Sequence, residues 1–168
     1  LRTKLQSTPA MANVYVAFKS FFKQKPFENR EALLIDLLSY AKHYGILIRA
    51  NSSIPELNTI ITRLNRFEAT VTRPFFLEIL KLAESDDNSD TVISQKDLIE
   101  IFKYVESYLF RRMICDIPTN ALNKIFVALN REIINFDDDT GNYLEKFKFA
   151  LLKKSNRGLF PRDEVFAQ

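Results

Sequence analysis

The sequence predicts an all-α protein, folded as an orthogonal or irregular bundle of six to seven helices. Apolar side chains recur every three to four residues along most of the chain, and no segment shows the sustained alternation of a β-strand. The 168 residues include three Gly and six Pro, fewer than turn-rich sandwiches or barrels normally use. Hydrophobic residues make up 46% of the chain, including 15 Phe, so one core can be filled. We therefore predict a single helical domain over residues 1–168.

Prolines and polar residues divide the first half of the chain into four helices. The first is predicted over residues 8–24 and ends before a proline that breaks its apolar run. The second is predicted over residues 33–48, with an apolar stripe wide enough to indicate burial on more than one side and a break at Gly45. The third and fourth, residues 54–67 and 72–83, each begin with a polar cap and a first-turn proline.

Three further helices are predicted in the second half of the chain. Ser94 caps the fifth helix, which continues to the turn at Pro118. The sixth begins after a cap at Thr119 or Asn120, and the seventh covers residues 144–152.

Residue composition and the chain end indicate the biological context. Residues 160–164 resemble a new helix start with an acidic first turn, so we expect the chain to be a fragment of a longer protein. The apolar neighbours of Cys115, the single cysteine, favour a buried structural thiol in a reducing compartment over a reactive one. No apolar run reaches the roughly 18 to 20 residues that span a bilayer, and no signal peptide is evident. We predict a cytoplasmic protein without a membrane partner.

Catalytic motifs are absent from the sequence. His43 is the only histidine, which argues against a His/Cys zinc site, a Ser-His-Asp triad or an HNH-type nuclease centre. The three glycines are isolated, so there is no glycine-rich phosphate loop. We predict no catalytic residue, no cofactor and no metal, and a structural or surface role for His43.

One acidic loop resembles a calcium-binding loop in part. Asp86, Asn88 and Asp90 match its first, third and fifth positions. Thr91 stands where the sharp turn needs glycine, and Asp97 stands at the position that favours the longer glutamate. A solvated acidic loop is therefore favoured over a calcium site.

A basic run near the chain end is a candidate contact for DNA. Six cationic residues face a single acid, Glu145, within residues 145–162. They are Lys146, Lys148, Lys153, Lys154, Arg157 and Arg162. Such residues can contact phosphates with salt-dependent affinity, but a solvated helix face with a basic last turn explains them too. The formal net charge of +3 does not decide between the two, and we favour the second.

Two adjacent arginines interrupt the apolar stripe of the fifth helix. Helical spacing puts Arg112 on the stripe and Arg111 about 100° away. A charge on a buried stripe needs a partner, which is either Asp116 at i+4 or carbonyls at a neighbouring helix end. We interpret the pair as a clamp that ties the fifth helix to the Pro118 turn and the sixth helix, in preference to a phosphate site. The predicted clamp residues are Arg111, Arg112, Asp116, Asn120 and Asn123.

The region around these arginines resembles a known family. The stretch Glu106-Ser107-Tyr108-Leu109-Phe110-Arg111-Arg112, followed by Ile114-Cys115, Pro118-Thr119-Asn120 and residues 122–126, resembles the helical middle region of GmrSD-type restriction endonucleases. These proteins carry domain-of-unknown-function families 262 and 1524. Residues 14–19, residues 41–44 and the Phe160-Pro161 and Asp163-Glu164 pairs add weaker similarity. Asp116 departs from the pattern, which has glycine there.

The resemblance implies a role within a larger protein. In that family a ParB-like nucleotide-binding domain precedes the helical region and an HNH-like nuclease follows it, and some members cleave DNA with modified cytosines in phage defence. None of those active-site motifs is present here. We therefore expect a non-catalytic scaffold whose partners are flanking domains of the parent chain and DNA. The alternative is a free-standing helical protein-interaction module.

Overall fold

The computed structural model describes residues 9–24, 30–84, 93–136 and 141–166. Within these residues the chain forms eight α-helices and four short 3-10 turns, without a β-strand, which confirms the all-α prediction. The helices are α2 (Val14–Gln24), α3 (Arg30–Arg49), α4 (Pro55–Arg66), α5 (Arg73–Ala83), α6 (Gln95–Ile114), α7 (Leu122–Ile134), α8 (Tyr143–Leu152) and α9 (Asp163–Phe166). The turns are η1 (Met11–Asn13), η2 (Thr70–Thr72), η3 (Thr119–Ala121) and η4 (Asn156–Gly158).

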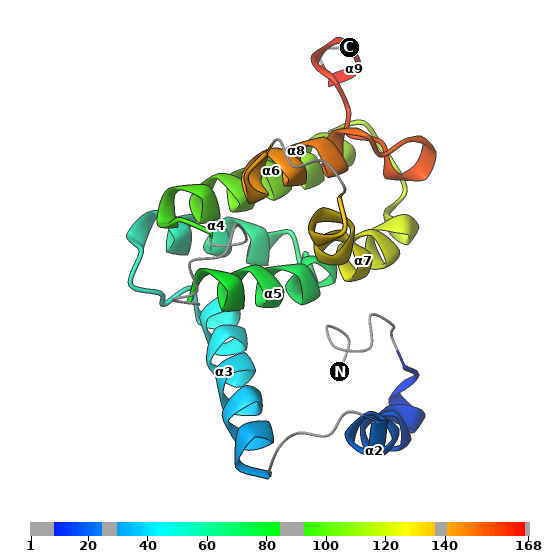
Figure 1. Cartoon of the computed structure of the whole chain (residues 1–168). Coiled ribbons are helices and arrows are strands. Elements are labelled where there is room, and N and C mark those ends of the chain that lie inside the picture. The colour runs from blue at the N-terminus through cyan, green and yellow to red at the C-terminus, as the bar shows by residue number, and fades with distance from the viewer. Residues whose placement is uncertain (1–8, 25–29, 85–92, 137–140, 167–168) are drawn as a thin grey trace.

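Helices α4 to α8 form the body of the molecule around one apolar core (Figure 1). Phenylalanine rings from different helices stack at its centre. Phe76 of α5 and Phe102 of α6 have ring centroids 3.9 Å apart, and the centroids of Phe75 and Phe147 are 5.7 Å apart. Such aromatic pairs contribute beyond the apolar area that they bury, so these contacts fix α5, α6 and α8 relative to one another.

A polar chain also crosses the body. The Tyr143 hydroxyl donates to Asn130 Oδ1 at 2.7 Å, and Asn130 Nδ2 donates to Glu78 Oε2 at 3.1 Å. Burial raises the pKa of the Tyr143 hydroxyl, and the nearby Glu78 carboxylate raises it further, so the phenol stays a donor. The chain links α8, α7 and α5 by directional contacts.

Three predicted helix caps need correction. Helix α4 begins after Ile54 without the expected polar cap. Ser94 caps α6 as expected, with its Oγ accepting from the Asp97 N–H at 3.1 Å. Thr72 does not cap α5, since its hydroxyl donates to the Ala69 carbonyl at 2.7 Å and closes η2 instead. Neither Thr119 nor Asn120 caps α7, because both lie within η3. Before both α5 and α7, a 3-10 turn leads directly into the helix.

Helix α3 departs most from its prediction. Gly45 lies inside the continuous helix, so the expected break is wrong. The expected burial on several sides is also wrong. Figure 1 shows α3 extending out of the body, and only Leu47 near its C-terminal end belongs to the core.

The side of α3 that meets α5 is polar. Asp36 forms an ion pair with Lys81, and the Tyr40 hydroxyl donates to Glu78 Oε1 at 3.5 Å. The opposite side carries four apolar residues that are exposed by 45 to 69%, namely Leu34, Ile35, Leu37 and Leu38. We call these four residues the α3 apolar face.

Candidate functional site

The Arg112 side chain lies at the end of α6 and is only 2% exposed. One terminal nitrogen donates to the Leu159 carbonyl at 3.0 Å and contacts the Tyr108 hydroxyl at 3.3 Å. The other donates to the Pro118 carbonyl at 2.7 Å and the Arg157 carbonyl at 2.8 Å. A planar guanidinium has the rigid fork of donors that this arrangement needs. Arg112 thus connects α6 to two other parts of the chain.

Tyr108, one turn earlier on α6, completes the arrangement. Its hydroxyl donates to the Gly158 carbonyl at 2.7 Å. Burial raises the pKa of this hydroxyl, and the Arg112 guanidinium opposes part of that rise. The carbonyls of residues 157, 158 and 159 therefore all accept hydrogen bonds from two side chains of α6.

Arg111 contacts the chain a few residues further on. Its guanidinium donates to the Pro161 carbonyl at 3.1 Å and lies 2.6 Å from Asp163 Oδ1. It also lies 4.8 Å from the Phe166 ring centroid, a cation–π contact. We call Tyr108, Arg111 and Arg112 the arginine clamp, and residues 156–166 the C-terminal segment that it holds.

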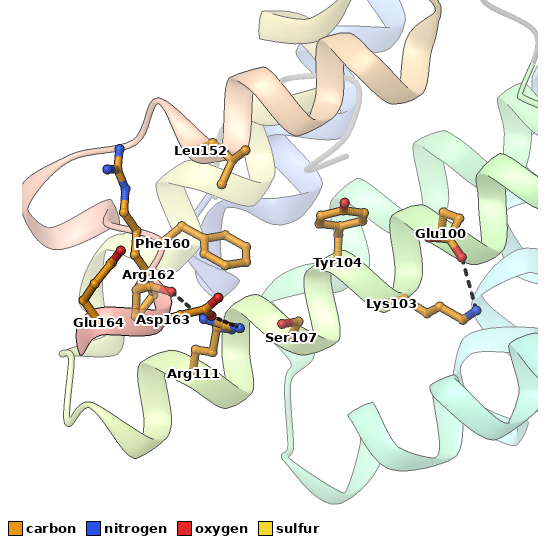
Figure 2. A pocket seen from close by; sticks show the side chains of 11 residues that line it. Glu100, Lys103, Tyr104, Ser107, Arg111, Leu152, Phe160, Arg162, Asp163 and Glu164 are labelled. Carbon is orange, nitrogen blue, oxygen red and sulfur yellow. Dashed lines mark hydrogen bonds and ion pairs between the residues drawn. The ribbon is translucent and has the colours of Figure 1, made fainter. Parts of the chain in front are cut away.

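A cavity of about 580 Å³ lies between α6 and the C-terminal segment. Figure 2 shows Arg111 and Asp163 directed toward each other at one end, and the Lys103–Glu100 pair at the other. Ser107 lies on the α6 wall of this cavity, and no histidine or lysine among the described residues hydrogen-bonds to its hydroxyl to activate it. The lining therefore supplies binding surface and paired charges.

Three predicted clamp residues form no hydrogen bond or ion pair with the side chains of the two arginines among the described residues. Asp116 is exposed, and the four hydrogen-bond acceptors of Arg112 in the described residues are three carbonyls and a hydroxyl. Asp116 has a φ of 52°, the left-handed conformation that glycine adopts at lowest cost. Asn120 and Asn123 are exposed, and neither is among the partners of Arg111 or Arg112 in the described part of the chain.

The predicted basic run divides into three residues that line no common groove and a second group of three that does. Lys148 pairs with Glu145 at 3.2 Å, and its ammonium lies 5.4 Å from the Tyr104 ring centroid. Arg162 lines the cavity of Figure 2, and Lys146 is half-buried on α8. The remaining three, Lys153, Lys154 and Arg157, line a different groove of about 740 Å³.

Lys124 joins that second group and was missed by the sequence analysis. It lies on α7, about 30 residues before the others, and lines the same groove. Only the packing of α7 against α8 brings it there. We call Lys124, Lys153, Lys154 and Arg157 the basic groove.

His43 is buried rather than at the surface. It is 1% exposed, and its Nε2 lies 3.0 Å from Glu84 Oε2. Burial alone would raise the pKa of the Glu84 carboxyl, but its contacts with His43 and Lys42 outweigh burial and lower it. This pair anchors α3 to the end of α5.

The remaining candidates are the acidic loop, a cluster of metal ligands and the single cysteine. Asp86, Asn88 and Asp90 lie outside the described residues. Within the described ranges, no group of three or more His, Cys, Asp or Glu side chains is arranged to hold a metal ion. Cys115 is half-buried, with Sγ 3.9 Å from the Val165 carbonyl. No described helix combines the length and the apolar character that crossing a membrane requires.

Comparisons with family models, with curated proteins and with solved structures find no match to this chain. The chain is an all-α protein in which a buried arginine at the end of α6 binds three backbone carbonyls.

Proposed function

We propose that this chain is a non-catalytic helical scaffold that fixes the direction in which the polypeptide leaves the helical body. The burial of Arg112 carries the proposal. Desolvating a guanidinium is costly, and well-packed apolar residues often give equal stability. A charge that ties three backbone carbonyls to one helix end instead specifies a position.

The α3 apolar face is a candidate for a second contact surface on the same scaffold. Leu34 and Leu38 are 59% and 69% exposed, on the side of α3 turned away from α5. Contiguous exposed apolar residues commonly mark protein contacts. A scaffold between two domains needs one such surface in addition to the C-terminal segment that the arginine clamp holds.

We further propose that the scaffold belongs to a GmrSD-like, nucleotide-dependent DNA endonuclease, cytoplasmic and used in restriction. The support is the residue similarity to that family, together with a contact between two of the similar stretches. The two similar stretches at 106–112 and 160–164 are about 50 residues apart in sequence, and Arg111 touches both Pro161 and Asp163. The free-standing interaction module remains the alternative.

The gene that encodes the chain separates these proposals. A ParB-like segment upstream and a histidine-containing nuclease motif downstream would support the scaffold of an endonuclease. Their absence from both sides would contradict it and favour the free-standing module.

Activity of the parent protein then tests the scaffold role. Arg112→Lys removes the fork but keeps the charge, and we expect DNA cleavage to fall at least tenfold while circular dichroism shows intact helices. Lys96→Arg on the exposed first turn of α6 is the matched control and should cleave normally. Unchanged cleavage by a folded Arg112→Lys variant would remove the scaffold role.

A further inference from the structure

The basic groove gathers charge from three separate elements. Lys124 comes from α7, Lys153 and Lys154 follow α8, and Arg157 lies in η4. Among the described residues of its lining, Glu132 is the one acidic residue, so four positive charges there meet one negative charge. The described lining thus carries more positive than negative charge.

Most of these cations are available to a ligand. Lys154 pairs with Glu132, whereas Lys124, Lys153 and Arg157 are exposed and have no carboxylate partner among the described residues. The Arg157 carbonyl is also held by Arg112, so the backbone that carries this side chain is anchored. An anchored cation loses less conformational freedom on binding an anion.

An aromatic ring lies in the same groove. Phe149 is 48% exposed, and Phe136 packs edge-on against it with ring centroids 5.0 Å apart. The Lys153 ammonium lies 5.5 Å from the Phe149 ring centroid. A half-exposed ring in a groove with several cations can stack a nucleobase while the cations contact phosphates.

We propose that the basic groove binds single-stranded nucleic acid, with phosphates on Lys124, Lys153 and Arg157 and one base stacked on Phe149. A duplex would engage the cations alone, because its bases are stacked within the helix. The volume of about 740 Å³ lies within the range of pockets that enclose small ligands. This inference goes beyond the scaffold proposal and does not rest on it.

Fluorescence anisotropy with a labelled oligothymidine, at about 50 and 200 mM salt, tests the groove. We expect salt-dependent binding, because each neutralised phosphate releases counterions. Lys124→Glu and Arg157→Glu should each weaken binding at least fivefold and reduce the salt dependence. Lys96→Glu makes the same charge change on α6, outside the groove, and should stay within twofold of the wild type.

Phe149→Leu tests the stacking contact. It keeps an apolar side chain beside Phe136 but removes the ring, so we expect at least a fivefold loss of affinity for the single strand. Circular dichroism should show the same helix content in every variant.

Three results would overturn the proposal: no salt-dependent binding of the oligonucleotide, equal losses for Lys124→Glu and Lys96→Glu, or a duplex or an acidic peptide bound as tightly as the single strand with no effect of Phe149→Leu. None of them would bear on the scaffold, which is tested by cleavage in the parent protein.

Discussion

Arg112 shows how a single residue can determine a local geometry. Its charge has no carboxylate partner among its described contacts, so the cost of burying it is offset by hydrogen bonds to carbonyls and a hydroxyl at 2.7 to 3.3 Å. Lysine would bring one point charge, which cannot reproduce the two separate nitrogens that bind the Pro118 and Leu159 carbonyls. The neighbouring Arg111 is half-buried, and its ion pair with the exposed Asp163 is weak by comparison.

Alanine substitutions should separate the two arginines. Arg112→Ala removes a side chain that is only 2% exposed and leaves three carbonyls without their donor, so we expect it to lower the free energy of unfolding by about 2 to 4 kcal/mol. Arg111→Ala should cost less than about 1 kcal/mol. Urea denaturation of both variants measures the difference, and equal small losses would contradict the clamp.

Tyr108 should behave as part of the same arrangement. Tyr108→Phe keeps the ring in place but removes the donor to the Gly158 carbonyl, so we expect a loss of about 1 to 2 kcal/mol. Tyr15→Phe, at a position that is 71% exposed, is the matched control and should change stability by less than about 0.5 kcal/mol. The midpoints of urea denaturation give both values, and a silent Tyr108→Phe would mean that water replaces the hydroxyl.

Acid should weaken the attachment of α3 through Glu84. The pKa of its carboxyl is lower in the folded protein than in the unfolded chain, so its contribution is present above the ordinary glutamate value of about 4.3. That contribution is lost as the pH falls through the lowered folded value. Urea denaturation from pH 7 to 3 should therefore show wild type and Glu84→Gln converging in acid. A constant difference across that range would exclude the linkage.

At the scale of elements, the sequence identified helices better than it identified their faces. The capping by Ser94 and the prolines of α4 and α5 are local signals, and the structure bears out the corresponding helices. The wide apolar stripe of α3 predicts burial on more than one side. This prediction is wrong because periodicity locates an apolar face but not what covers it. The polar face of α3 instead meets α5 through Asp36 and His43.

Polar substitutions on α3 should therefore be tolerated. We expect Leu34→Gln with Leu38→Gln to change the free energy of unfolding by less than about 1 kcal/mol in total, since both side chains are mostly exposed. Leu57→Ala on α4, at a fully buried position, is the comparison and should cost about 2 to 5 kcal/mol. A large loss from the double variant would show that the α3 apolar face is covered within the isolated protein.

At the scale of the whole molecule, contacts between distant segments could not be predicted. The sequence indicated that Arg112 needs a partner, and it allowed carbonyls as well as Asp116. It could not indicate which carbonyls, because every residue carries one and only the fold brings residues 157–159 to α6. The basic groove has the same origin, since Lys124 joins Lys153 only through helix packing.

Cleavage by trypsin tests directly how the arginine clamp holds the C-terminal segment. The peptide bond after Arg157 contains the carbonyl that Arg112 holds, so this bond must leave the clamp before a protease can cut it. We expect Arg112→Met, which keeps an apolar stem but lacks the donors, to speed cleavage after Arg157 at least tenfold by mass spectrometry. Arg111→Met leaves that carbonyl bound and is the matched control.

Cleavage after Lys103, in the middle of α6, distinguishes local release from unfolding of the body. If the clamp acts locally, Arg112→Met accelerates the cut after Arg157 more than the cut after Lys103, because only the C-terminal segment detaches. Equal acceleration at both bonds would mean that Arg112 supports the body as a whole. Equal cutting of wild type and variant after Arg157 would mean that the segment is held by its other contacts, of which Arg111 with Pro161 is the strongest candidate.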